Sequence, residues 1–245
     1  MITDVPGAGT PVLVVHGLGC TSTADYRTLA EALSGRRLLL ADLCLAEDPD
    51  APDDHTIEGL ARYLDQRLTG RGIARVVLFG HSAGGAIALS LARLAPARVA
   101  GVFLTECNLD PGGGDYSRRI AGQSKADFVA QGFAGLIAEQ RRECPTHAAT
   151  LEVSAPAALH RESQSLVAGT TPTWRDIMYD LTCPRTYVFS ESALPDPDVA
   201  ELPRHGVQVA IIPSAGHNMA YDNPAALAET FERFLADLDP QPPTR

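Results

Sequence analysis

The serine at position 82 stands in a setting that suits a nucleophile. Residues 80–84 read Gly-His-Ser-Ala-Gly, which fits the pattern Gly-x-Ser-x-Gly. The apolar run 76–79 before the motif predicts a strand, and residues 83–94 after it predict a helix. A sharp strand-to-helix turn of this kind exposes the serine hydroxyl at the edge of a sheet. We therefore expect Ser82 to be a nucleophile, the alternative being an ordinary glycine-rich turn.

A serine hydroxyl is a poor nucleophile without a base, and His217 is the best-placed candidate. It follows a strand predicted over residues 207–212 and precedes a helix predicted to begin at residues 223–224, Asn-Pro. This position puts it on a loop at the carboxyl edge of the sheet, beside Ser82. The alternative is a solvated loop histidine. Of the others, His16 is expected to be structural, and His81 could point into the pocket.

The four residues after the first predicted strand supply a further part of an acyl-transfer site. Residues 16–19 read His-Gly-Leu-Gly, and glycines let the backbone approach a substrate closely. A tetrahedral intermediate needs two hydrogen-bond donors aimed at its oxyanion. We expect these donors to be the backbone N–H of Ala83 and that of Leu18 or its neighbour.

Strands and helices alternate along most of the chain. Runs that are apolar throughout predict parallel strands buried on both faces; they lie at residues 12–15, 38–41, 76–79 and 99–104. Strands are predicted again at residues 186–189 and 207–212. Apolar residues at helical spacing predict helices at residues 24–34, 56–69 and 83–94. Residues 110–183 contain no convincing strand. The pattern therefore indicates an α/β domain with a helical insertion of about 70 residues.

These motifs, in this order and each at a strand end, resemble the α/β-hydrolase superfamily from residue 12 to about residue 238. The resemblance implies an α/β-hydrolase fold, with a mostly parallel sheet flanked by helices. It implies a core of residues 1–109 and 184–245, and a helical cap of residues 110–183 inserted after the strand that follows the nucleophile helix. Few residues precede the first predicted strand, so the opening hairpin of the family is expected to be missing or reduced.

The acidic member of the triad has several candidates. The family usually places an aspartate a few residues past the next-to-last strand, where this chain has Ala193. Some members place the acid at the end of the strand before the cap, and Glu106 stands there. A carboxylate that ends a buried strand needs a partner. We favour Glu106 as the acid; Asp196 is the alternative, and Glu191, Asp198 or no acid also stay open.

Composition excludes some classes of function. The 245 residues carry 20 basic and 30 acidic side chains, a net charge of −10 with histidine neutral. That balance argues against binding to nucleic acid or to an anionic membrane surface. Five widely spaced cysteines form no metal-binding pattern, and no signal peptide or membrane-spanning run is visible. We expect a cytoplasmic protein with free thiols and a disordered tail over residues 240–245.

The combined expectation is a serine hydrolase that needs neither cofactor nor metal. Its small-molecule substrate would be a small or medium, largely apolar ester, lactone or thioester. A set of apolar residues in the insertion could line its cavity or pack the cap itself: Phe128, Phe133, Leu136, Ile137, Trp174, Met178 and Tyr179. Two rivals stay open, a C–C hydrolase or lyase with the same triad, and a receptor-like binding protein with little turnover. The oligomeric state is not predicted.

Overall fold

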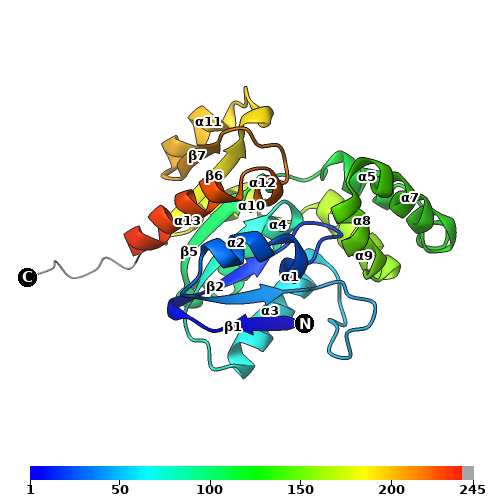
Figure 1. Ribbon diagram of the computed structural model, residues 1–245, viewed down its shortest axis with the longest axis horizontal. Helices are drawn as coiled ribbons and strands as arrows, with labels where there is room; N and C mark the ends of the chain where they lie inside the picture. The colour runs from blue at the N-terminus through cyan, green and yellow to red at the C-terminus, as the bar shows by residue number, and fades with distance from the viewer. Residues whose placement is uncertain (239–245) are drawn as a thin grey trace, which may run out of the picture.

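A seven-stranded sheet forms the centre of the molecule, which a computed structural model describes over residues 1–238 (Figure 1). The order across the sheet is β1-β3-β2-β4-β5-β6-β7, and every neighbouring pair except β1 with β3 is parallel. The tail expected to be disordered lies outside the described residues. The strands are β1 (Ile2–Val5), β2 (Ala8–Val15), β3 (Arg36–Ala41), β4 (Val76–His81), β5 (Val99–Thr105), β6 (Arg185–Ser190) and β7 (Gln208–Ile212).

The edge of the sheet formed by the N-terminal residues contains one more strand than the sequence predicted. The expected first strand is the second half of β2, and a further strand, β1, precedes it and runs antiparallel to β3. One antiparallel strand is thus present where the resemblance suggested a missing or reduced hairpin. Its four residues form a short edge strand with a single buried side chain, Ile2, so no apolar run marked it.

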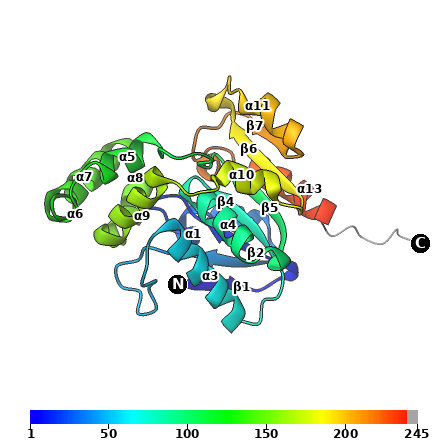
Figure 2. The same cartoon turned by 180° about the vertical axis from the view of Figure 1, so that it is seen from behind.

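Helices cover both faces of the sheet. Figure 1 shows α2 (Arg27–Ala32) and α13 (Pro224–Leu238) in front of the strands, and Figure 2 shows α3 (Ile57–Gly70), α4 (Ala83–Leu94) and α10 (Trp174–Asp180) on the other face. Adjacent strand residues are buried against opposite layers: Val12 and Val14 belong to the first face, Leu13 and Val15 to the second. This two-sided burial explains why the central parallel strands contain continuous apolar runs.

Of two helices predicted in the first part of the chain, one is divided and one is continuous. The helix expected over residues 24–34 is divided into α1 (Ser22–Asp25) and α2, which meet at Tyr26. The helix expected over residues 56–69 is α3, and the Thr56 hydroxyl caps it by accepting a hydrogen bond from the Gly59 N–H at 3.0 Å. Side-chain capping of this kind satisfies one of the N–H groups that a helix start leaves free.

Residues 110–183 are helical. A group of helices lies to one side of the sheet in both views, α5 (Asp115–Ala121), α6 (Lys125–Asp127), α7 (Phe133–Glu143), α8 (Pro145–Glu152) and α9 (Pro156–Ala168), with a π-helical turn at Phe128–Gly132 (Figures 1 and 2). The last helix of the segment, α10, instead packs against α4. Its Trp174 is fully buried and donates a hydrogen bond from Nε1 to Ser90 Oγ at 3.1 Å.

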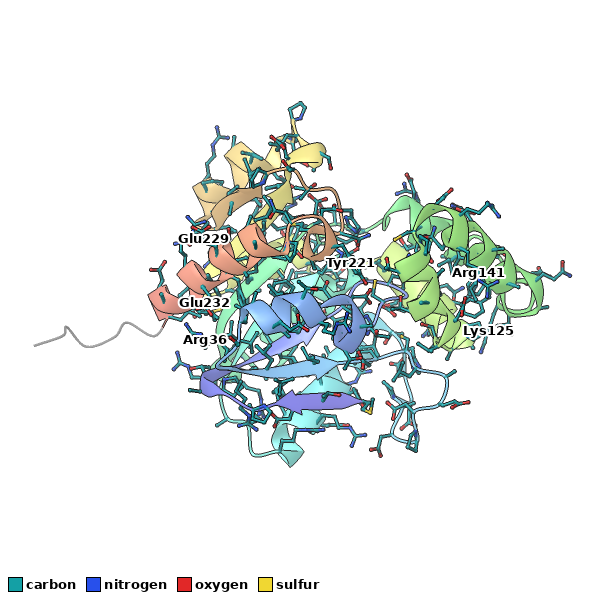
Figure 3. The ribbon with its side chains drawn as sticks, in the orientation of Figure 1. Arg36, Lys125, Arg141, Tyr221, Glu229 and Glu232 are labelled. Atoms are coloured by element: carbon teal, nitrogen blue, oxygen red, sulfur yellow. The ribbon has the colours of Figure 1, made fainter. Side chains whose placement is uncertain are left out.

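The sheet and its outer helix are also joined by charge. Arg36, at the start of β3, pairs with Glu232 of α13 at 2.7 Å, and Figure 3 shows the two side chains close together. The same figure shows Arg141 and Lys125 on the helices of the insertion. The short helix α11 (Asp198–Glu201) is partly exposed. The short helix α12 (Met219–Asp222) lies between the loop carrying His217 and α13.

Candidate active site

Ser82 occupies a sharp turn between β4 and α4. Its backbone has φ 51° and ψ −121°, a region that residues other than glycine rarely adopt. An added Cβ on Gly80 would lie 2.7 Å from Gly85 Cα, and one on Gly84 would lie 2.3 Å from the Val15 carbonyl oxygen. Both glycines are therefore required for the chain to turn this closely. Strain of this kind at a serine is typical of a nucleophile elbow.

A cavity of about 360 Å³ opens beside the elbow. Three of the residues expected to take part in catalysis, Ser82, His217 and Glu106, line it together with Leu18. Ala83 follows Ser82 as the first residue of α4, so its N–H is among those that a helix start leaves without an intrahelical acceptor. The fold thus brings together at one place residues that are up to 199 positions apart, counted from Leu18 to His217.

His217 and Glu106 face each other in this cavity. His217 Nδ1 lies 3.5 Å from Glu106 Oε2, and Glu106 Oε1 accepts hydrogen bonds from Ser190 N at 2.8 Å and Ser190 Oγ at 3.0 Å. Burial alone would raise the pKa of Glu106, but the hydrogen bonds from His217 and Ser190 outweigh it and lower that pKa. The carboxyl is therefore ionised at neutral pH and faces the Nδ1 side of the ring.

The other candidate acids are engaged elsewhere. Asp196 Oδ1 accepts a hydrogen bond from the Asp198 N–H at 2.8 Å. Asp198 itself pairs with Arg175 at 2.8 Å, and Glu191 Oε2 accepts from the Ser214 N–H at 2.8 Å. Among the four carboxylates considered, Glu106 is the one for which a contact with His217 is seen.

Residues 16–20, which are expected to supply an oxyanion donor and are called the oxyanion loop for that expectation, pack directly against the elbow. An added Cβ on Gly17 would lie 3.3 Å from Ser82 Cβ. His16 is buried, and its Nε2 accepts a hydrogen bond from Leu43 N at 3.1 Å, so Nδ1 carries the proton that it donates to Gly17 O at 2.8 Å. Cys20 N–H donates to the same oxygen at 3.1 Å. Because a trans peptide holds its N–H opposite its C=O, the Leu18 N–H points away from these contacts.

His81 completes the floor of the site. Its ring is buried, its centre lies 4.8 Å from that of His217, and its Nδ1 lies 3.1 Å from Thr105 O. Burial, assisted by the neighbouring His217, lowers the pKa of His81 to about 3. His81 is therefore neutral across the physiological pH range, and its charge does not change with pH there. Its place inside the elbow motif was the only sequence signal for this location.

The far wall of the cavity comes from residues that sequence reasoning did not select. Tyr116 of α5, His147 of α8 and Leu166 of α9 line it, and Asn108 lies at the exit of β5. The apolar set proposed from the sequence packs elsewhere. Trp174 of α10, for example, packs against α4, and Phe128 contacts Phe133 with ring centres 5.9 Å apart. Residue type alone did not separate side chains that face the cavity from those that pack the helices.

Within residues 1–238, no three or more His, Cys, Asp or Glu side chains gather in a way that could hold a metal ion. In the same part of the chain, no helix combines the length and the apolar character needed to cross a bilayer.

Comparison with solved structures finds the same fold in several enzymes. A thermophilic esterase from Thermogutta terrifontis, in a malate-bound structure, is 22% identical with a TM-score of 0.79 over 97% of this chain and 93% of its own. The N-acyl homoserine lactonase AidH, complexed with N-butanoyl homoserine, is 20% identical with a TM-score of 0.72 over 100% and 95%. A bromoperoxidase from Bacillus anthracis is 16% identical with a TM-score of 0.78 over 96% and 95%. At these identities the likeness establishes the fold and confirms the expected α/β class.

A relative is also found by sequence. A Mycobacterium phage D29 protein named as a non-heme haloperoxidase is 28% identical over 134 residues, which are 54% of this chain and 44% of that protein. The chain thus spans less than half the length of this curated relative. The family model described as alpha/beta hydrolase family matches residues 12–230. This chain therefore belongs to the α/β-hydrolase family.

Proposed function

We propose that this protein is a serine hydrolase in which Ser82, His217 and Glu106 form the catalytic triad. The observation that carries the proposal is the shared cavity: a serine held at positive φ lines it together with a histidine whose Nδ1 faces an ionised glutamate. A serine, a base and a group that orients the base are the parts that nucleophilic acyl transfer requires.

In the proposed reaction, His217 removes the proton from Ser82 Oγ as that oxygen attacks the acyl carbonyl carbon. The carbonyl oxygen becomes an oxyanion, which accepts hydrogen bonds from the backbone N–H groups of Leu18 and Ala83. Glu106 stabilises the imidazolium form of His217, which gives its proton to the leaving alcohol or thiol as the oxyanion re-forms the carbonyl and the C–O or C–S bond to that group breaks. Water attacks the acyl-serine with His217 again as the base, and Ser82 regains its proton from His217 as the acid is released.

The charges around the cavity favour an uncharged substrate. The lining residues include Glu106 and Asp115 and no arginine or lysine. Three arginines of the insertion are paired with carboxylates: Arg118 with Asp115, Arg119 with Glu139 and Arg141 with Glu152. A carboxylate in the substrate would thus lie near Glu106, with no arginine or lysine among the described residues of the lining to bind it.

We infer a small or medium ester, lactone or thioester as the substrate class. The cavity volume of about 360 Å³ suits a molecule of this size. The apolar part of the acyl chain would contact Leu18 and Leu166, and the ring of Tyr116 would cover it. An esterase and an N-acyl homoserine lactonase among the proteins of similar fold are consistent with this class.

A fluorophosphonate labelling experiment with a panel of p-nitrophenyl esters tests the proposal. The wild type should bind one equivalent of label at Ser82, and it should release a burst of p-nitrophenol as the acyl-enzyme forms. Ser82→Ala should lose the label and at least about 10³-fold in kcat. Ser163→Ala is a matched control, because Ser163 is a buried serine of α9 that donates to Leu159 O at 2.8 Å.

Full activity in Ser82→Ala, or label at another residue, would contradict the assignment. Turnover of a carbon–carbon bond without any burst would favour the lyase or C–C hydrolase chemistry that uses the same residues.

A further inference from the structure

Helix α8 of the insertion contacts the oxyanion loop at consecutive residues. His147 Nε2 lies 3.3 Å from Leu18 O, and Thr150 Oγ1 donates to Gly19 O at 3.0 Å. Leu151, also on α8, lies close to Gly19, because a Cβ added to Gly19 would be 2.6 Å from Leu151 Cδ2. The insertion therefore touches the loop that supplies one of the proposed oxyanion donors.

Three successive peptide units of the loop are held from two directions. The core holds the Gly17–Leu18 peptide through His16 and Cys20, as described above. The next two peptides, which carry Leu18 O and Gly19 O, accept their hydrogen bonds from α8. Gly17 and Gly19 make the loop backbone permissive, and Gly19 has φ 73°. The Gly19–Cys20 peptide links the two sets of contacts, because its C=O accepts from Thr150 while its N–H donates to Gly17 O, the oxygen of the peptide that carries the Leu18 N–H. Without the contacts from α8 these peptides could turn, and the Leu18 N–H would change direction with them.

We propose that α8 is a working part of the oxyanion hole, and that His147 and Thr150 are positioning residues which fix the direction of the Leu18 N–H. The inference rests on the proposed serine-hydrolase function. It assigns to the insertion a role in transition-state stabilisation in addition to that of a cavity wall.

The chemistry of His147 suits this role. A carbonyl oxygen only accepts, so Nε2 must carry a proton to bind Leu18 O. Burial lowers the pKa of His147, which keeps the ring neutral at neutral pH and leaves Nδ1 as an acceptor. Nδ1 faces the side-chain amide of Gln140, with Oε1 at 3.0 Å, and an amide can turn its NH₂ toward a neutral ring or its oxygen toward a protonated one. The contact with Leu18 O is compatible with both states.

Thr150 is coupled to His147. Its hydroxyl lies 2.9 Å from His147 O as well as 3.0 Å from Gly19 O, so its single hydrogen is shared between helix and loop. Loss of either side chain should loosen one peptide, and loss of both should release the two peptides together. Removal of a whole oxyanion donor costs about 10²- to 10³-fold in kcat, which sets the upper limit for misdirecting one.

Two substitutions remove the donors while keeping the shape of the side chains. His147→Phe and Thr150→Val should each lower kcat by roughly tenfold with KM nearly unchanged, because the oxyanion forms only in the transition state. Phenylboronic acid, which forms a tetrahedral adduct with a serine, should bind more weakly by the same factor. Thr150→Ser keeps a hydroxyl and should retain wild-type kcat.

The chain offers a matched control for each change. His160, in α9, also contacts a backbone carbonyl through Nε2, but that of Gln123 at 2.9 Å and within the insertion. Thr230, in α13, donates to Ala226 O at 2.8 Å, far from the oxyanion loop in the sequence and in a helix of the opposite face. His160→Phe and Thr230→Val should leave kcat and boronate affinity near wild type, which separates positioning from general damage.

Amide hydrogen exchange of a peptide spanning residues 16–21 gives a readout that does not need activity. Exchange there should rise in His147→Phe and Thr150→Val and stay unchanged in both controls. Wild-type exchange in the two variants, or equal losses of kcat in variants and controls, would overturn the proposal. If the wild type reacts with neither fluorophosphonate nor ester, the serine-hydrolase function fails and with it the catalytic role of α8, whereas faster exchange would still show that α8 holds the loop.

Discussion

The elbow and the helical insertion are built under opposite constraints. At the elbow, backbone lies against backbone: Gly84 leaves no room for a Cβ because Val15 O would be 2.3 Å away. In α7 of the insertion, Gly135 has nothing within 4 Å of an added Cβ. The strand that leads into the elbow is buried along its whole length, whereas exposed ion pairs such as Arg119 with Glu139 join the helices of the insertion.

This difference separates the chemistry of the site from its selectivity. The groups that would react are fixed by close backbone contacts, which dictate residue type. The wall of the cavity is formed in part by single side chains that reach back from surface helices, such as Tyr116 and Leu166. The helices could keep their packing while those side chains changed, so substrate choice can vary without disturbing the elbow.

The largest expected fall in kcat comes from replacing the residues at and beside the elbow. His217→Ala should lower kcat by at least about 10³-fold and up to about 10⁶-fold, because Ser82 then has no base. The double variant with Ser82→Ala should be little worse than either single one, since members of a triad act as a unit. Steady-state kinetics on a p-nitrophenyl ester measures the cycle. Additive losses would show that the two residues do not cooperate.

The acid comes next in size. Glu106→Gln keeps the shape but removes the charge beside His217, so kcat should fall by up to about 10⁴-fold. Asp196→Asn should stay within roughly tenfold of wild type, because Asp196 contacts the Asp198 N–H instead. Circular dichroism should show both variants folded before kcat is compared. The reverse ranking would identify Asp196 as the acid, and activity in both would reduce the triad to a dyad.

The sequence predicted these residues because each stands where a strand ends. Ser82, Glu106 and Leu18 directly follow or closely follow β4, β5 and β2, and the carboxyl ends of parallel strands meet at one edge of a sheet. Position along the chain therefore indicated position in space. The choice of Glu106 over Asp196 needed a further argument, the cost of leaving a strand-end carboxylate without a partner.

The insertion was less predictable for a physical reason. Its helices bury side chains on more than one face, because they pack on each other as well as on the core. Phe133 and Leu166 have similar character, yet Leu166 lines the cavity while Phe133 contacts Phe128. Helical spacing shows that a residue is buried but not against which neighbour. The role of His147 depends on a contact with Leu18 O, 129 positions away, which no local pattern encodes.

A pair of glycine substitutions tests the contrast in packing directly. Gly84→Ala should destabilise the protein by about 1–3 kcal/mol or more, because its Cβ would press on the backbone of Val15 and His16. Gly135→Ala should stabilise it by roughly 0.5–1 kcal/mol, since alanine favours a helix interior and meets nothing there. Urea unfolding followed by circular dichroism measures both. Equal effects of the two substitutions would contradict the difference drawn between the regions.

The smallest effect should appear in substrate choice. Leu166 is buried on α9 and lines the cavity, so Leu166→Ala should enlarge it and shift relative kcat/KM toward longer acyl chains. Each methylene in an apolar pocket is worth about 1–3 kcal/mol at most, and an imperfect fit should give a few-fold change per carbon. Phe133→Ala is the control, because Phe133 lies in the same insertion without lining the cavity. Kinetics on p-nitrophenyl esters of two to eight acyl carbons gives the preference of each variant. A shift in Phe133→Ala with none in Leu166→Ala would mean that the acyl chain runs between the helices of the insertion and not through the cavity beside Ser82.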